Sequence, residues 1–301
     1  MKNHPIDARV PPCAQAGLND IKPNRIREKL SAATCSLLGM SLTAQAEPGI
    51  WDLSSTVLYY QESDGRVQAL EPVFAGRRDF GDERYLNLKL TLDVLTGASP
   101  SGAVPSSTVQ TFTRPSGKGS YTVAPGEIPL DDTFHDTRGA INAGWQQPVH
   151  GLGTLSFGGN ISAEYDYLSI GANGNFAFDF NHKNTTLSTG LALALDSISP
   201  EGGLPTPFAA MRPANTTPAR DKPDDSKTVV DALLGVSQVI NRNLLMQVNY
   251  ALTMTDGYHT DPFKLVSVVD SAGEPQTHLF EKRPDSRVRN SLFWQTKYYW
   301  H

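Results

Sequence analysis

The sequence predicts an all-β protein, an antiparallel up-and-down transmembrane β-barrel of about ten strands. Three observations lead to this prediction. Apolar and polar residues alternate in segment after segment, the long connections between segments fall on one side, and the chain starts with a segment typical of exported proteins.

The segment from Tyr85 to Leu95 shows the alternation most clearly. Every second residue from Leu86 to Val94 is aliphatic, and the four residues between them are polar: Asn87, Lys89, Thr91 and Asp93. Successive side chains of a strand point to opposite faces, so this segment has one apolar and one polar face. Similar segments of about ten residues recur along the chain, and a tilted strand of this length can cross a bilayer.

The remaining strands follow in order and are separated by turn signals such as Ser63-Asp64-Gly65. The expected strands are 51–60, 66–75, 85–95, 137–146, 155–165, 170–180, 187–195, 230–240, 244–255 and 287–300. Pro72 weakens the second of these strands. Three connections are long and rich in Pro, Gly, Ser or Asp, and we interpret 97–133, 196–228 and 256–286 as loops, the last with room for a hairpin.

These three long loops are all odd-numbered connections when counting starts at the first strand, and every even-numbered connection is short. Transmembrane barrels have this asymmetry, with short periplasmic turns and long external loops. Aromatic residues also gather at strand ends, as in interfacial girdles. The alternative is a soluble periplasmic β-sandwich, which has shorter strands and needs a second sheet to cover its apolar face.

Residues 1–46 are expected to be a signal peptide. Arg25, Arg27 and Lys29 precede a modest apolar run, and Ala44-Gln45-Ala46 forms a small-x-small cleavage site. Cleavage after Ala46 would leave residues 47–301 as the barrel domain in the outer membrane of a Gram-negative cell. It would also remove both cysteines, so we expect no disulfide and no thiolate metal site.

Charge and hydropathy limit the partners of this protein. No run of 18 apolar residues occurs, so the sequence predicts no membrane-spanning helix. Removing residues 1–46 takes away six Lys/Arg and three Asp/Glu, which changes the net charge from -5 to -8. Such an acidic protein is a poor ligand for nucleic acid. The expected partners are membrane lipid and the outer-membrane barrel assembly machinery, with no cofactor.

Three stretches of the sequence resemble a known bacterial family. They are the run from Asp93 to Ala103 (D-V-L-T-G-A-S-P-S-G-A), the segment from Thr111 to Pro115, and the segment from Ser162 to Tyr167. Together they resemble the family called domain of unknown function 3570. The resemblance implies an exported, porin-like outer-membrane barrel without an established activity. It also implies further strands after one like Phe293 to Trp300, so that a complete barrel would have more strands than this chain supplies.

Candidate chemistry is sparse, and we expect no enzymatic activity. A barrel can carry a surface hydrolase at its external rim, where an Asp–His pair could activate water. The rim candidates are Asp131, Asp132, His135, His259 and Asp261. Since His and Asp are common in solvated loops, we predict no catalytic, cofactor-binding or metal-binding residue.

The polar faces of the strands are expected to line the lumen. The charged residues predicted to do so are Lys89, Asp93, Arg138, Glu164, Asp179, Arg289 and Lys297. A barrel of about ten strands is narrow. Mixed charges inside it favour a closed or very narrow lumen, and the predicted role is structural, ligand-binding or narrow-pore transport.

Overall fold

The computed structural model describes residues 49–63, 66–114, 117–149, 151–216 and 220–300 of the 301-residue chain. Within these ranges it does not describe the side chains at positions 99, 100, 132, 133 and 221. The described residues belong to one compact unit, Ala46–His301. The predicted signal peptide, residues 1–46, lies outside the described residues, and its cleavage remains a prediction.

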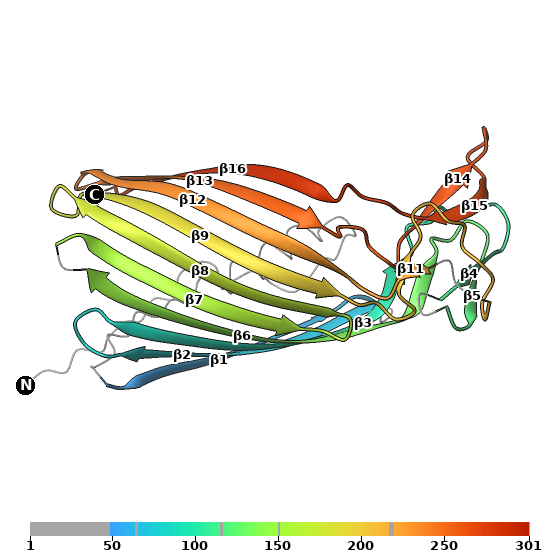
Figure 1. Cartoon of the computed structure of the whole chain (residues 1–301), viewed down its shortest axis with the longest axis horizontal. Helices are drawn as coiled ribbons and strands as arrows, with labels where there is room; N and C mark the ends of the chain where they lie inside the picture. Colours follow the sequence, from blue (N-terminus) through green and yellow to red (C-terminus); the bar gives the residue numbers. More distant parts are fainter. Residues whose placement is uncertain (1–48, 64–65, 115–116, 150, 217–219, 301) are drawn as a thin grey trace, which may run out of the picture. The chain divides into compact units, whose positions relative to one another are not determined.

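Ten long strands form one antiparallel sheet in chain order, which confirms the predicted all-β up-and-down fold class (Figure 1). They are β1 (Trp51–Gln61), β2 (Val67–Asp79), β3 (Tyr85–Pro100), β6 (Leu130–Val149), β7 (Gly153–Ala163), β8 (Tyr167–Phe180), β9 (Thr185–Ile198), β12 (Asp225–Asn241), β13 (Leu244–Gly257) and β16 (Ser286–Tyr298). No helix among the described residues is long and apolar enough to span a membrane.

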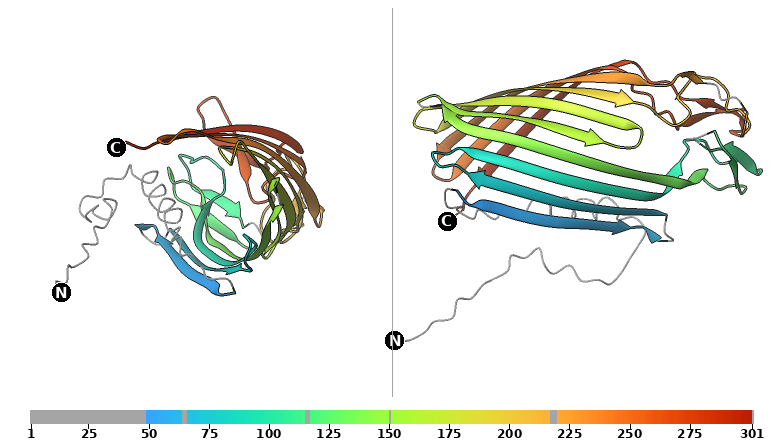
Figure 2. Two further views of the ribbon diagram at one scale, coloured as in Figure 1. Left: turned by 90° about the vertical axis from the view of Figure 1, so that its left-hand side faces the viewer. Right: turned by 60° about the horizontal axis from the view of Figure 1, so that its bottom comes forward.

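The sheet is strongly curved but open. Its order is β1-β2-β3-β6-β7-β8-β9-β12-β13-β16, and the described pairings include none between β1 and β16. Figure 2 shows the curved sheet end-on, with these two strands at its edges. The expected barrel is therefore present as a curled ten-stranded wall, and the further strands implied by the family resemblance remain a prediction.

The register of the strands separates a polar face from an apolar face. Residues paired directly across neighbouring strands share a face. One such row crosses the whole sheet: Asp52, Arg77, Asn87, Gly144, Gly158, Asn173, Ala192, Asp231, Thr253 and Arg289. The adjacent row points to the other face: Leu53, Gly76, Leu88, Ala143, Gly159, Ala172, Leu193, Val230, Met254 and Val288. The second row contains no polar side chain, so the alternation in the sequence becomes a separation of faces in the sheet.

No described part of the protein covers the apolar face. On β9, Leu191 is 66% exposed, Leu193 47% and Leu195 55%. A soluble sandwich would bury such a row beneath a second sheet. The other sheets of the described chain have only two strands each and lie within the long connections. The ten-stranded sheet is therefore a single layer.

The long strands extend into all three predicted loops, and most clearly into the first. β3 continues to Pro100 and β6 begins at Leu130, because Ser99 and Pro100 pair with Asp131 and Leu130 beyond a register shift. Gly97 permits this shift, since its φ is +145° and a Cβ there would collide with the backbone of Arg66.

Pro72 has the predicted local effect on β2. It pairs with Val57 on the β1 side, but the register with β3 has no pair at Glu71 or Pro72. Proline has no N–H to donate to a neighbouring strand, so the ladder is interrupted there while β2 continues.

Each long connection contains a hairpin of its own. These are β4 (Gln110–Thr113) with β5 (Ser120–Val123), β10 (Leu204–Pro205) with β11 (Arg220–Lys222), and β14 (Leu265–Val269) with β15 (Pro275–Phe280). Only the third hairpin was predicted. All three connections leave the same end of the sheet, on the right in Figure 1.

Candidate functional site

The three long connections pack together into a small structure that we call the loop cap, which comprises the described residues within 101–129, 199–224 and 258–285. Its core is built from Ala103, Phe112, Val123 and Leu265, all at least nine-tenths buried. Phe112 has no exposed surface and stacks on the Tyr121 ring, with centroids 5.4 Å apart. The cap therefore has an interior like that of a soluble domain.

Hydrogen bonds join the three connections to one another. The Leu265 N–H donates to the Ser101 carbonyl at 2.8 Å, which links the first and third connections. The second and third are linked by the Met211 N–H, which donates to the His278 carbonyl at 2.8 Å. The first and second are linked by the Thr113 hydroxyl, which donates to the Arg212 carbonyl at 2.7 Å. No single loop could hold this arrangement alone.

A cavity of about 730 Å³ lies between the cap and the adjacent end of β6. Its apolar lining includes Phe134 from β6 and Met211, Phe263 and Phe280 from the cap. Its charged lining comprises Arg114, Asp131, Asp136, Asp166, Glu201, Arg212, Arg220, Asp261 and Lys264. This volume can hold a small organic molecule, and a lining that combines apolar and charged side chains suits an amphipathic one.

Three of the five rim candidates line this cavity, namely Asp131, His135 and Asp261. Asp131 is 6% exposed and forms an ion pair with the Arg114 guanidinium at 3.1 Å. Asp261 accepts a hydrogen bond from the Phe263 N–H at 2.9 Å. The side chain of Asp132 lies outside the described residues.

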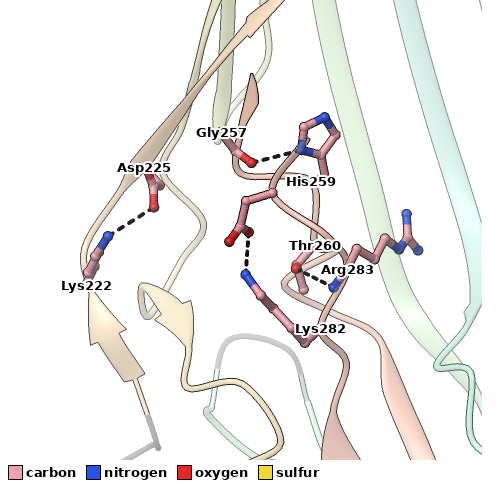
Figure 3. A network of polar contacts seen from close by, with 8 residues as sticks. Lys222, Asp225, Gly257, His259, Thr260, Lys282 and Arg283 are labelled. Carbon is pink, nitrogen blue, oxygen red and sulfur yellow. Dashed lines mark hydrogen bonds and ion pairs between the residues drawn. The ribbon is translucent and has the colours of Figure 1, made fainter. Parts of the chain in front are cut away.

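His259 is not among the residues that line the cavity. Its Nδ1 lies 2.8 Å from the Gly257 carbonyl and its Nε2 lies 2.6 Å from the Thr255 hydroxyl. Figure 3 shows this imidazole at the start of the third connection. The Arg283 N–H there donates to the Thr260 hydroxyl at 3.0 Å, and Lys282 pairs with Asp285. Both ring nitrogens of His259 thus hold the loop in place.

Burial shifts the pKa of several groups near the cavity. Desolvation lowers the pKa of the Arg220 guanidinium, which donates to the Gly203 carbonyl at 2.8 Å and lies 5.0 Å from the centre of the Phe280 ring. Desolvation also raises the pKa of Tyr258 to about 12. The pKa of Asp166 is raised by desolvation and then by the negative charge of Asp136. Burial thus disfavours the charged form of each of these three groups.

The described part of the chain holds no group of three or more His, Cys, Asp or Glu side chains that could bind a metal ion.

The predicted lumen residues all lie on, or directly continue, the polar face that the register defines. Arg138 donates from Nε to the Asp93 carboxylate at 2.7 Å. Asp179 accepts from the Thr186 hydroxyl at 2.8 Å, and Arg289 donates to the Thr253 hydroxyl at 3.3 Å. The remaining three are Lys89, Glu164 and Lys297. Several of these charges are thus paired along the wall.

A second cavity, of about 450 Å³, lies against this polar face. It is lined by Asn87, Lys89, Asn142 and Asn173 together with Gly144 and Gly158. Since a cavity forms on the concave side of a curved sheet, the polar face is the inner face.

Sequence reasoning missed the basic part of the rim site. Arg114, Arg212 and Arg220 line the cap cavity, but each stands alone in a loop of mixed composition. Thr113-Arg114-Pro115 was noted only as part of the family resemblance. No local pattern points to the meeting of these side chains, because each comes from a different place in the two long connections 97–133 and 196–228.

A family model described as "Protein of unknown function (DUF3570)" matches residues 27–301. No curated protein matches. Among solved structures, the chain is similar to "Outer-membrane expressed OmpT of Vibrio cholerae", with 12% sequence identity and a TM-score of 0.40. That match covers 83% of this chain and 65% of the other chain.

Proposed function

The chain belongs to the DUF3570 family, whose function is unknown, and from this premise we propose that it is an outer-membrane β-barrel protein that lines a narrow passage. The curled sheet forms the membrane wall and the loop cap stands at its external end. Membership of this family implies no activity, so the proposal depends on the contrast between the apolar and the polar face of the sheet.

The observation that carries the proposal is the uncovered apolar face. It extends over all ten strands, and many of its side chains are about half exposed or more, including Leu53 at 74% and Leu292 at 74%. Soluble monomers rarely expose apolar patches larger than a few hundred Å². Acyl chains of a bilayer would cover this face, whereas the polar inner face would remain in contact with water.

The loop cap supports an orientation for the barrel. All three long connections leave one end of the sheet, and the turns at the other end are short. In outer-membrane barrels the long loops face outward. We therefore place the loop cap outside the cell and the turns at 151–152 and 181–184 in the periplasm.

We further propose that the rim residues hold the cap together and do not catalyse a reaction. Asp131 is engaged with Arg114, and the ring nitrogens of His259 contact Thr255 and Gly257. A surface hydrolase remains the second candidate because Asp131, His135 and Asp261 line the same cavity. Changing these three residues and His259 to Ala in the purified barrel tests it, and loss of a measured hydrolysis would favour the enzyme.

Fractionation of cells that express the full chain tests the main proposal. We expect the protein in the outer-membrane fraction, starting at Glu47, with a gel mobility that changes on heating. Protease added to intact cells should cut within the cap and spare the turn at 181–184. An uncleaved protein in the cytosolic or periplasmic soluble fraction would contradict the proposal.

A further inference from the structure

The inner face of β7, β8 and β9 differs from the rest of the lumen wall because its middle carries no charge. Every charged side chain of these three strands lies near a strand end, at Asp179 and Asp196. Elsewhere the inner face is charged, with Asp93 and Arg138 on β3 and β6 and Asp231 and Arg289 on β12 and β16. Asn, Ser, Thr, Gly and Ala make up this neutral sector.

Within the neutral sector, asparagines lie opposite glycines on the neighbouring strand. Asn160 of β7 pairs with Gly171 of β8, and Gly158 of β7 pairs with Asn173 of β8. A third pair joins Asn175 of β8 to Gly190 of β9. We call Asn160, Asn173 and Asn175 the amide track.

Each amide of the track lies close over its partner glycine. A Cβ placed on Gly171 would lie 2.5 Å from the Asn160 Oδ1, and one on Gly190 would lie 3.0 Å from the Asn175 Nδ2. The corresponding distance from Gly158 to the Asn173 Oδ1 is 3.4 Å. The glycines therefore leave space for the amides, which lie close against the sheet.

These amides remain available for hydrogen bonding. No hydrogen bond between described residues engages the side chain of Asn160, Asn173 or Asn175. An amide offers two donors and an acceptor with two lone pairs, and it has no net charge. Asn173 also lines the 450 Å³ cavity, where Asn87 and Asn142 add two more amides.

We propose that the amide track guides small uncharged polyhydroxylated solutes, such as sugars, through the barrel. Hydroxyl groups both donate and accept hydrogen bonds, so they can replace water on successive amides without a change in charge. A charged solute would have to exchange its hydration for contacts with neutral groups on this side. The inference rests on the proposed membrane barrel and adds a solute class to it.

Liposome swelling with the full-length protein tests the track. Three solutes of nearly equal size serve as probes: glucose, which is neutral, gluconate, which is anionic, and glucosamine, which is cationic. We expect glucose to enter faster than either charged solute. Equal rates for all three, or no entry of glucose into liposomes that contain inserted, heat-modifiable protein, would overturn the track but leave the membrane location standing.

An isosteric variant makes the test specific to these residues. Replacing Asn160, Asn173 and Asn175 together by Asp keeps side-chain shape and adds negative charge to the wall. We expect glucose entry to fall and glucosamine to enter faster than gluconate. The matched control is Asn181→Asp, in the turn after β8, which should keep the wild-type order. Unchanged rates in the triple variant would show that the solute path does not follow this wall.

A second variant tests the amide track without adding a charge to the wall. Gly171→Leu should push the Asn160 amide away from the sheet and into the lumen, because the added Cβ would meet it at 2.5 Å. Glucose entry should then decrease while the variant still inserts with heat-modifiable mobility. The corresponding change on the lipid side, Gly174→Leu, has open space at its Cβ and should leave entry unchanged. Equal rates for both variants would overturn the proposed track.

A protein that fails to insert at all would overturn the membrane barrel and, with it, the track. Insertion is scored separately by flotation of the liposomes and by heat-modifiable mobility. The two proposals therefore fail in distinguishable ways.

Discussion

The ten-stranded sheet and the loop cap bury apolar side chains in opposite ways. The sheet contains most of the described residues but leaves its aliphatic side chains exposed, such as Leu191 at 66%. The cap is small, yet it holds the buried apolar cluster of the described residues, in which Phe112 has 0% exposure. The two regions therefore treat apolar side chains differently: the sheet leaves them exposed, where we propose that lipid covers them, whereas the cap buries them in an interior of its own.

The largest expected effect concerns the cap. Phe112→Ala removes its fully buried ring and should destabilise the cap by about 3–5 kcal/mol. Cutting within residues 101–129 by protease should become much faster, while the heat-modifiable mobility of the sheet is unchanged. Phe157→Ala is the control, because Phe157 is 50% exposed on the apolar face. Loss of the membrane-inserted form in the Phe112 variant would mean that cap and sheet are one cooperative unit.

The next effect concerns the sheet. Leu193→Arg puts a charge on the apolar face and should cost about 2–4 kcal/mol if the position lies near the bilayer midplane. Ala192→Arg, one residue earlier, points to the inner face, where Asp231 is its cross-strand neighbour. It should therefore be tolerated better. Urea unfolding in liposomes measures the free energy of unfolding of both variants. Equal losses of stability would mean that both faces are buried in protein.

A smaller effect concerns pH and is again confined to the cap. Desolvation lowers the pKa of His278, whose Nδ1 lies 3.1 Å from the Ser267 hydroxyl and whose ring is 4.8 Å from that of Phe112. Because the folded cap holds this imidazole neutral, its contribution to stability is present above the ordinary pKa of 6.5 and is lost as the pH falls below it.

Cap cleavage should therefore accelerate between pH 7.5 and pH 5, and His278→Gln should weaken this dependence. A sheet that loses its heat-modifiable mobility over the same range would contradict the separation of the two regions.

The smallest expected effect is at the surface of the cap. Lys118 and Glu201 form an ion pair at 3.3 Å between the first and second connections, with side chains 81% and 44% exposed. Exposed pairs contribute about 0–1 kcal/mol. Glu201→Gln should leave protease resistance of the cap nearly unchanged, and a large loss would show that surface charge, and not the apolar core, holds the loops together.

The sheet could be predicted from the sequence because each strand carries its own signal. Alternation between Leu88 and Lys89 repeats in the neighbouring strands, and period two assigns each residue to a face without any knowledge of its partner. The sequence also indicated that the three long loops are all odd-numbered connections and so leave the same end of the sheet. The ends of the strands could not be predicted in the same way. The extension of β3 to Pro100 depends on a register shift at Gly97, which the alternation of residues does not show.

The cap could not be predicted, for a physical reason. Its strands have only two to six residues, too few for a periodic pattern. Its core joins Phe112 of the first connection to Leu265 of the third, and the sequence around either residue does not indicate that it is buried. The amide track was hidden in a similar way, because the Asn160–Gly171 pair is seen only once the register of β7 and β8 is known.

The long separation between partners in the cap has a consequence for folding kinetics. Val104 and Ser267, joined by a hydrogen bond, are 163 positions apart, and Ser106 and Glu274 are 168 apart. Six of the nine neighbouring strand pairs of the sheet are joined by short turns. The cap, in contrast, must bring together three segments that are far apart in the sequence. Because non-local contacts form slowly, we expect refolding to proceed in two phases, with amide protons of the sheet protected before those of the cap.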